Sequence, residues 1–202
     1  MNLKDTYNRI AEDWYKDHKS DSWWVEGTDA FVSFLPKGGS VLDVGCGAGV
    51  KSKYLSEKGL CVLGIDFSDK LIEIAKRDVP GVEFLVIDMK DAGTLEREFD
   101  GIFSQASLLH IPKKEVIAVL KGLASRLKKG GHLYIAVKEK WEGQDEEQVV
   151  VEEGYGYQYE RFFSYFTKEE LRGYLKELGM EAVFESATPM HKTTWLQIIG
   201  RK

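Results

Sequence analysis

The feature that most constrains the fold is an alternation of short apolar runs with segments of helical period. The runs are rich in β-branched residues, and helical patterns at 51–58, 69–77 and 113–128 lie between them. Parallel strands need a crossover of a dozen or more residues, so this order predicts parallel strands joined by helices. The five runs are Ser40–Gly45, Cys61–Asp66, Val82–Asp88, Phe99–Gln105 and His132–Lys138.

The end of the chain departs from this order. After a helical pattern at Lys168–Leu178, two strand-like runs, Met180–Ser186 and Thr194–Gly200, are separated only by a short loop. That loop is too short for a parallel crossover, which predicts an antiparallel hairpin. The expected fold is therefore a single-domain, Rossmann-like, doubly wound α/β sheet of seven strands with helices on both faces and a C-terminal antiparallel hairpin.

Two segments lie outside this pattern within an expected single domain of residues 1–202. Residues 1–36 predict a helical cap of two helices, Asp5–His18 and Ser22–Leu35, the first with an aromatic stripe. Residues 139–166 follow a strand end and form an insertion, whose part Glu139–Tyr159 is acidic and fits neither a core helix nor a core strand. We expect a mobile lid or substrate loop there, with a solvated surface loop as the alternative.

Composition limits the partners. The chain of 202 residues has 28 Lys and Arg against 33 Asp and Glu, a net charge of −5, which argues against nucleic acid as a partner. The two cysteines, Cys46 and Cys61, form no CxxC pair, so we expect neither a disulfide framework nor a metal site. With no leader and no apolar stretch of about 20 residues, we expect a cytoplasmic protein without a membrane partner, monomeric or homodimeric.

A glycine-rich loop, Asp43–Gly49, follows the first strand and opens a helix. Such loops let a ligand approach backbone N–H groups closely, which indicates a nucleotide-like ligand at the carboxyl ends of the strands. A dinucleotide fingerprint would place its third small residue at position 50, where this chain has Val50. Asp43 is a poor neighbour for a pyrophosphate but is compatible with a cationic ligand.

With this loop the sequence resembles the class I S-adenosylmethionine-dependent methyltransferase family, in its small-molecule type. The family's first motif is an acidic residue followed by G-x-G-x-G, and the resemblance extends over about 7–138. It implies S-adenosylmethionine as cofactor, with Asp66 on the ribose hydroxyls, and with Asp88 and Met89 beside the adenine. The implied cofactor-binding residues are Tyr7, Tyr15, Asp43, Gly45, Cys46, Gly47, Gly49, Asp66, Phe67, Ser68, Asp88, Met89, Gln105 and Ala106.

Methyl transfer from a sulfonium is an in-line displacement, so the protein mainly aligns the nucleophile and excludes water. His110, after the fourth strand, is the first candidate for a base, and Glu139, after the fifth, is the second. The alternatives are a structural histidine before a turn and a solvated glutamate.

Aromatic residues in the N-terminal helices and in 139–166 are candidates for binding the acceptor, and an arginine there suits a carboxylate or phosphate. The alternative is that these side chains are core or paired with each other. The candidates are Trp23, Trp24, Trp141, Tyr157 and Arg161. Motifs for nucleobase methylation are absent, which favours a small-molecule methyl acceptor.

Two other functions remain open on the sequence alone. An NAD(P)-dependent oxidoreductase of Rossmann type would use the same loop and Asp66, although Val50 and the terminal hairpin count against it. A non-catalytic S-adenosylmethionine-binding protein would keep the loop and lack an acceptor pocket.

Overall fold

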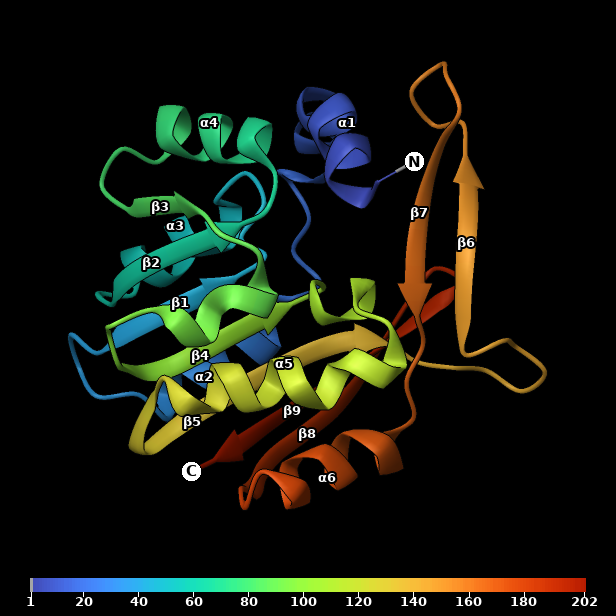
Figure 1. The fold of residues 1–202 in the computed structure, drawn as a ribbon. Helices are drawn as coiled ribbons and strands as arrows, with labels where there is room; N and C mark the ends of the chain where they lie inside the picture. The colour runs from blue at the N-terminus through green and yellow to red at the C-terminus, as the bar shows by residue number, and fades with distance from the viewer. Residues whose placement is uncertain (1) are drawn as a thin grey trace.

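A seven-stranded sheet forms the centre of the computed structural model, which describes residues 2–202 (Figure 1). The strand order is β3-β2-β1-β4-β5-β9-β8, with β1 to β5 parallel and β9 antiparallel to both β5 and β8. The predicted doubly wound sheet with a terminal hairpin is confirmed. The strands are β1 (Ser40–Val44), β2 (Cys61–Asp66), β3 (Glu83–Val86), β4 (Phe99–Gln105), β5 (Leu127–Lys138), β8 (Glu181–Met190) and β9 (Thr193–Arg201).

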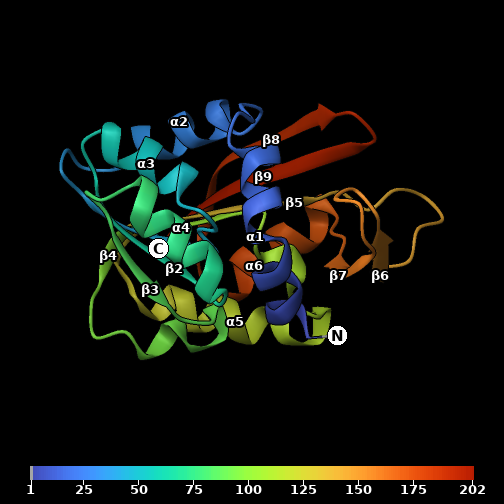
Figure 2. The same ribbon diagram turned by 90° about the horizontal axis from the view of Figure 1, so that it is seen from above.

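Helices cover both faces of the sheet (Figure 2). Phe31 and Leu55 pack on one face, while the helix that follows β4 and the last helix bury Leu120 and Leu171 in the larger core on the other. The helices are α1 (Leu3–His18), α2 (Val25–Ser33), α3 (Val50–Glu57), α4 (Asp69–Asp78), α5 (Lys113–Ser125) and α6 (Lys168–Glu177), with short 3₁₀ turns η1 (Met89–Thr94) and η2 (Leu108–His110).

β1 and β4 are neighbours in the sheet, and the strand order reverses between them. The connection after β1 leads to one side of the sheet, and the connection after β4 leads to the other. β1 runs beside β2, with Val44 opposite Ile65, and beside β4, with Asp43 opposite Phe103. In an open α/β sheet, ligands bind outside the carboxyl ends of the strands at such a switch point. The fold therefore directs attention to the loops after β1, β2 and β4.

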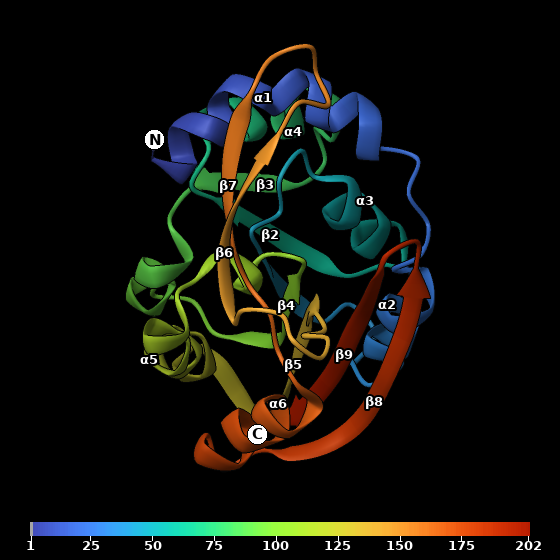
Figure 3. The same cartoon turned by 90° about the vertical axis from the view of Figure 1, so that its right-hand side faces the viewer.

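The insertion contains a two-stranded antiparallel ribbon, β6 (Glu147–Glu152) and β7 (Tyr159–Ser164), that lies apart from the main sheet (Figure 3). The sequence predicts no core helix or core strand in Glu139–Tyr159, and the strands found there lie outside the main sheet. β6 gives a weak sequence signal because Val149 and Val151 are exposed. β7 contacts α1 and η2, and its Phe163 is buried in the larger core.

Element ends differ from the predictions by a few residues. β5 begins at Leu127 and not His132, and both hairpin strands are longer, with β8 continuing to Met190. Strands are defined by backbone hydrogen bonds, and this bonding continues beyond the apolar run. Hydrophobicity alone therefore does not locate the ends of a strand accurately. Within residues 2–202, no helix has the length and apolar character needed to cross a bilayer.

Candidate active site

A cavity lies at the carboxyl ends of β1, β2 and β4 and is covered by α1. Its empty space, including the open mouth, is about 590 Å³, within the range of small-molecule sites. Ten of the fourteen cofactor-binding residues predicted from the resemblance line it. The lining is Tyr7, Trp14, Asp43, Gly45, Cys46, Gly47, Lys51, Asp66, Phe67, Leu71, Met89, Gln105, Ala106, Ser107 and His110.

Two glycines of the loop have backbone angles that favour glycine. Gly45 has φ +69°, and a Cβ there would meet the Ser107 Cβ at 2.3 Å. Gly49 has φ +80° at the N-cap of α3, with Phe84 at 2.9 Å from an added Cβ. The loop therefore packs directly on the turn after β4, and larger residues would push it out of place.

Asp66, the last residue of β2, holds the loop and faces the cavity. Its Oδ2 accepts from the Gly47 N–H at 3.0 Å, and its Oδ1 accepts from the Ser68 N–H at 2.8 Å. Burial raises the pKa of Asp66 to about 6 despite these bonds. A carboxylate has about four acceptor positions, so two remain for hydroxyl donors of a ligand.

Asp43 and Lys51 bring a second pair of charges to the cavity. Asp43 is buried, accepts from the Ser52 hydroxyl at 2.6 Å, and has its pKa raised to about 6 by burial. Burial lowers the pKa of the Lys51 ammonium, which has no ion pair or hydrogen bond among residues 2–202. The cavity thus holds an unpartnered cation beside a buried acid.

Gln105, at the end of β4, leaves a donor unused. Its Oε1 accepts from the Tyr134 hydroxyl at 2.7 Å, and within residues 2–202 its buried Nε2 has no partner. The Tyr134 hydroxyl is equally close to Gln197 Oε1, but one proton serves one acceptor. We assign the Gln197 amide the other way round and keep Gln105 in its orientation in the structure, because the Thr188 hydroxyl can then donate to the Gln197 oxygen and both Tyr134 contacts are satisfied. The Gln105 N–H₂ group is then left for a ligand in the cavity.

Tyr7, His110 and Arg161 form a chain of hydrogen bonds beside the cavity. The Tyr7 hydroxyl is 2.7 Å from His110 Nε2, and His110 Nδ1 is 2.7 Å from the carbonyl oxygen of Phe162. A carbonyl only accepts, so Nδ1 carries the proton and Nε2 accepts from Tyr7. Arg161 Nη1 donates to the Tyr7 oxygen at 3.3 Å. Burial lowers the pKa of His110 to about 3, so its ring is neutral.

This geometry bears on His110, the first candidate for a base. The nitrogen that would take a proton already accepts from Tyr7, and its low pKa makes it a weak base. The Tyr7 hydroxyl, with its proton directed to His110, is the group that presents an oxygen to the cavity.

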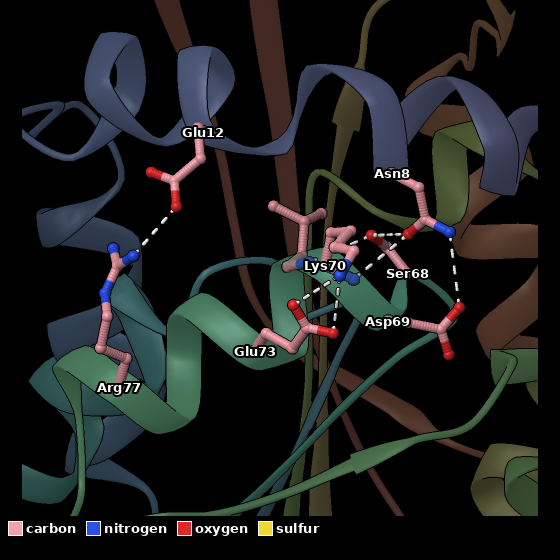
Figure 4. Close-up of polar contacts among 8 residues, drawn as sticks. Asn8, Glu12, Ser68, Asp69, Lys70, Glu73 and Arg77 are labelled. Carbon is pink, nitrogen blue, oxygen red and sulfur yellow. Dashed lines mark hydrogen bonds and ion pairs between the residues drawn. The ribbon is translucent and has the colours of Figure 1, made fainter.

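Helix α1 closes the cavity from above. A Cβ atom added to Gly47 would lie 3.3 Å from the Trp14 indole, so Trp14 covers this glycine closely. The indole also stacks on the His18 ring. Asn8 joins α1 to the start of α4: its Oδ1 accepts from the Ser68 hydroxyl at 2.7 Å and from the Lys70 N–H at 3.2 Å (Figure 4). The cover is therefore fastened to the element that begins just after Asp66.

Four predicted cofactor contacts lie outside this cavity, each with a structural role. Ser68 caps α4 by accepting from the Leu71 N–H. Gly49 packs on Phe84, and the Tyr15 hydroxyl faces Asp78. Asp88 accepts from the Lys90 N–H and lines an adjoining groove that it shares with Met89 and Phe67. The short side chains cap helices because their oxygens satisfy unpaired N–H groups.

The aromatic acceptor candidates also lie outside the cavity. Trp23 stacks on Trp195 with ring centroids 4.2 Å apart, Trp24 is buried against Tyr54, and Trp141 is 55% exposed. Tyr157 bonds to Asp13 under the Arg9 guanidinium.

Arg161, an acceptor candidate, and Glu139, a catalytic candidate, do not line the cavity. Arg161 is connected to it by a hydrogen bond to Tyr7, which does line it. Glu139 only extends the backbone of β5, bonding to Thr194 and bridging to Phe166. Trp23 and Trp24 pack on other aromatic rings, which bury large surfaces favourably, whereas Trp141 stays exposed.

Four lining residues, Trp14, Lys51, Leu71 and Ser107, are missing from the sequence prediction. Trp14 lies on the aromatic stripe of α1, and Lys51 follows the glycine loop directly, so both signals exist in the sequence. Ser107 follows β4 and Leu71 lies in the first turn of α4, so both come to the cavity only through the packing of the whole sheet. The part of the chain that the structure describes contains no cluster of three metal-ligating side chains.

Comparison with known proteins gives a family match. Residues 41–131 match the family model described as "Methyltransferase domain". The chain is 33% identical over 104 residues to the ubiquinone biosynthesis O-methyltransferase of Coxiella burnetii, covering 50% of this chain and 44% of that protein. It is 35% identical over 151 residues to phosphoethanolamine N-methyltransferase 1 of Zea mays, covering 71% of this chain and 29% of that protein. The chain therefore spans about half or less of these relatives.

Solved structures share the fold along nearly the whole chain. The 1,6-didemethyltoxoflavin-N1-methyltransferase of Burkholderia thailandensis, with bound S-adenosylhomocysteine, has a TM-score of 0.78 at 20% identity, over 99% of this chain and 87% of that one. Magnesium protoporphyrin IX methyltransferase of Synechocystis, with bound S-adenosylmethionine, has a TM-score of 0.75 at 20% identity, over 100% and 98%.

The sequence match and the structural likeness agree with each other. Residues 41–131 match a methyltransferase domain, and the chain has the fold of solved S-adenosylmethionine-dependent methyltransferases.

Proposed function

We propose that this protein binds S-adenosylmethionine in the cavity under α1 and transfers its methyl group to a small-molecule acceptor. The observation that carries the proposal is the unpartnered Gln105 amide nitrogen in a cavity that also contains Asp66 and the glycine loop. The cavity offers acceptors for ribose hydroxyls at one end and donors for a carboxylate at the other.

The lining fits this cofactor group by group. Asp66 has two free acceptor positions for the ribose hydroxyls, and Met89 and Phe67 supply apolar surface for the adenine. Lys51 and the Gln105 N–H₂ group suit the carboxylate of the methionyl part, and Asp43 suits its ammonium or sulfonium charge. When bound, the cofactor supplies a methyl group on a good leaving group.

The chain's own residues then position the acceptor. Tyr7 directs its proton to His110 Nε2, so the Tyr7 oxygen accepts a hydrogen bond from the N–H or O–H of the acceptor. His110 acts through Tyr7 as a positioning residue, held in one tautomer by the Phe162 carbonyl. Burial raises the pKa of the Tyr7 phenol, which keeps it protonated, and Arg161, which donates to the same oxygen, opposes part of this rise.

The flanking segments exclude water in this proposal. The cap of residues 1–36 covers the cofactor through Tyr7 and Trp14, and the insertion of residues 139–166 walls the acceptor side through Arg161. Similar proteins named for ubiquinone biosynthesis and for toxoflavin formation support a small-molecule acceptor.

Calorimetric titration with S-adenosylhomocysteine and, separately, with NADH tests the function. We expect S-adenosylhomocysteine to bind and NADH not to bind. Asp66→Asn should weaken S-adenosylhomocysteine binding by about 1 to 3 kcal/mol, or roughly 5- to 150-fold, because a charged acceptor is lost. Asp145→Asn, at an exposed acid in the insertion, is the matched control and should leave affinity unchanged.

Either of two results would reject the proposal. Binding of NADH alone would indicate an oxidoreductase. Binding of S-adenosylhomocysteine with no methyl transfer to any compound of a broad panel of amines, phenols and carboxylates would indicate a binding protein without catalysis.

A further inference from the structure

Lys138 is a second cation without a partner, and it lies outside the cofactor cavity. It is the last residue of β5, half-buried, with its Nζ 4.0 Å from the Phe163 ring centroid and 6.0 Å from that of Trp195. Its ammonium makes no ion pair or hydrogen bond among residues 2–202, and burial lowers its pKa to about 8. A half-buried ammonium without an acceptor costs free energy that a bound anion would recover.

The place of Lys138 is next to the reacting end of the site. The Phe163 ring beneath its ammonium also contacts the His110 ring, with centroids 5.0 Å apart, and His110 lines the cofactor cavity. The Arg161 guanidinium lies 5.0 Å from the same Phe163 ring and bonds to Tyr7. One aromatic ring therefore has two cations beside it, at the edge of the cavity.

Only one of these two cations is neutralised within the chain. Arg161 donates through Nε and Nη2 to the two carboxylate oxygens of Glu152, at 2.5 and 2.6 Å. Lys138 and Arg161 against Glu152 leave one net positive charge, in a protein whose net charge is −5. Phe163 and Trp195 are both buried and keep water from one side of Lys138, which strengthens its attraction for an anion.

The neighbouring cleft between α1 and the ribbon offers acidic groups, which would suit a cationic acceptor instead. Its carboxylates, however, already have partners. Asp13 accepts from Tyr157 at 3.2 Å, Asp17 accepts from Tyr155 at 3.5 Å, and Glu153 accepts from Gln158. These donors are neutral, so the cleft itself stays acidic. Lys138 is not among the residues that line the cleft; its ammonium lies beside Phe163 and Trp195, where an anion would find a cation without an ion pair among residues 2–202.

We propose that the methyl acceptor carries an oxyanion, a carboxylate or a phosphate, that pairs with Lys138 next to Arg161 at the end of β5. This inference rests on the proposed function, because it names the acceptor class of that site. Lys138 would thereby hold the acceptor beside the Tyr7 oxygen without itself taking part in methyl transfer.

Binding of simple probes to the protein saturated with S-adenosylhomocysteine tests this inference. The probes are benzoate and phenyl phosphate as the two anions, benzamide as the neutral analogue and benzylamine as the cation. Ligand-observed NMR detects dissociation constants up to the millimolar range. We expect at least one anion to bind ten times or more tightly than benzamide and benzylamine, and the tighter anion distinguishes a carboxylate site from a phosphate site.

Variants assign the effect to Lys138. Lys138→Met should remove the preference for the anion, and Lys138→Arg should retain it within about threefold, because it keeps the charge. Lys129→Met, an exposed lysine at the other end of β5, is the matched control and should bind like the wild type. Retained affinity of each variant for S-adenosylhomocysteine confirms that it is folded.

The outcomes separate the two levels of the proposal. If the wild type fails to bind S-adenosylhomocysteine, the proposed function is wrong. If it binds S-adenosylhomocysteine but shows no preference for either anion, prefers benzylamine, or keeps its preference in Lys138→Met, the oxyanion site is wrong and the proposed function stands.

Discussion

Asp43 is an acid that the fold buries before any ligand is bound. Its carboxylate accepts from Ser52 and lies near the Lys51 ammonium, yet burial still raises its pKa to about 6. The unfolded chain has no such burial, and its aspartates titrate near the ordinary value. Between these two pKa values the folded state binds the proton and the unfolded state does not, so the stability contributed by this residue falls as the pH rises.

The variant Asp43→Asn isolates this effect, because the amide oxygen still accepts from Ser52 but does not ionise. We expect the stability of Asp43→Asn relative to the wild type to increase from pH 4.5 to pH 7, by about 1 to 3 kcal/mol. Urea unfolding of the ligand-free protein at several pH values measures the difference. Asp29→Asn is the control: Lys58 lowers the pKa of Asp29, so its effect should be constant over this range. A flat profile for Asp43→Asn would contradict the assigned burial.

Tyr7 and His110 are expected to act as a unit, since the hydroxyl of one donates to the nitrogen of the other. Tyr7→Phe and His110→Ala should each destabilise the protein, and the double variant should be less destabilised than the sum, with a coupling of about 1 kcal/mol. Urea unfolding of the four proteins gives this coupling. With an identified acceptor, His110→Ala should lower turnover while its affinity for S-adenosylhomocysteine stays within a few-fold; equal losses in both would make His110 purely structural.

At the scale of elements, α1 acts as a cover held along two sides. Asn8 fastens it to α4 (Figure 4). On the other side, Arg9 donates to the Gln158 carbonyl of the ribbon turn at 3.2 Å. The amphipathic pattern predicts this helix correctly. It does not predict that Tyr7 and Trp14 face the cavity while Tyr15 faces Asp78, because the three lie on one stripe and only the packing of α1 on α4 separates them.

Asn8→Ala should loosen the cover and increase the dissociation rate of S-adenosylhomocysteine about 3- to 10-fold, since hydrogen bonds of roughly 1 kcal/mol in total are lost. Stopped-flow tryptophan fluorescence, with Trp14 over the glycine loop as a reporter, measures the rate. The matched control is Glu12→Ala on the same helix, whose ion pair with Arg77 is half-exposed and contributes little. An unchanged rate in Asn8→Ala would show that α1 does not limit release.

At the scale of the whole molecule, the terminal hairpin supports a residue of the cavity. The Tyr134 hydroxyl on β5 connects Gln197 on β9 to Gln105 on β4, and all three side chains are buried. Gln105 in turn lines the cavity, and its buried amide nitrogen has no partner among residues 2–202. The last strands therefore fix the orientation of a side chain that is about 90 residues earlier in the chain.

Tyr134→Phe removes this connection and leaves two buried amides short of a partner. We expect a loss of about 1 to 3 kcal/mol in the free energy of unfolding, measured in urea. Affinity for S-adenosylhomocysteine should also fall, because the Gln105 amide is then free to rotate. Phe103→Leu, a change in the ring that stacks on Tyr134, serves as the control: it should lower stability without a comparable loss of affinity. Unchanged affinity in Tyr134→Phe would contradict a role for Gln105 in binding.

The sequence by itself determined the sheet, the terminal hairpin and the position of the glycine loop with Asp66. These depend on local properties: apolar period, glycine at positive φ, and the length of a connection. Only the tertiary structure decided that His110 is bonded to Tyr7, that Lys51 and Gln105 face the cavity with unused donors, and that the predicted tryptophans pack elsewhere. Each of these depends on contacts between residues far apart in the chain, whose burial and hydrogen bonds exist only after the elements have packed together.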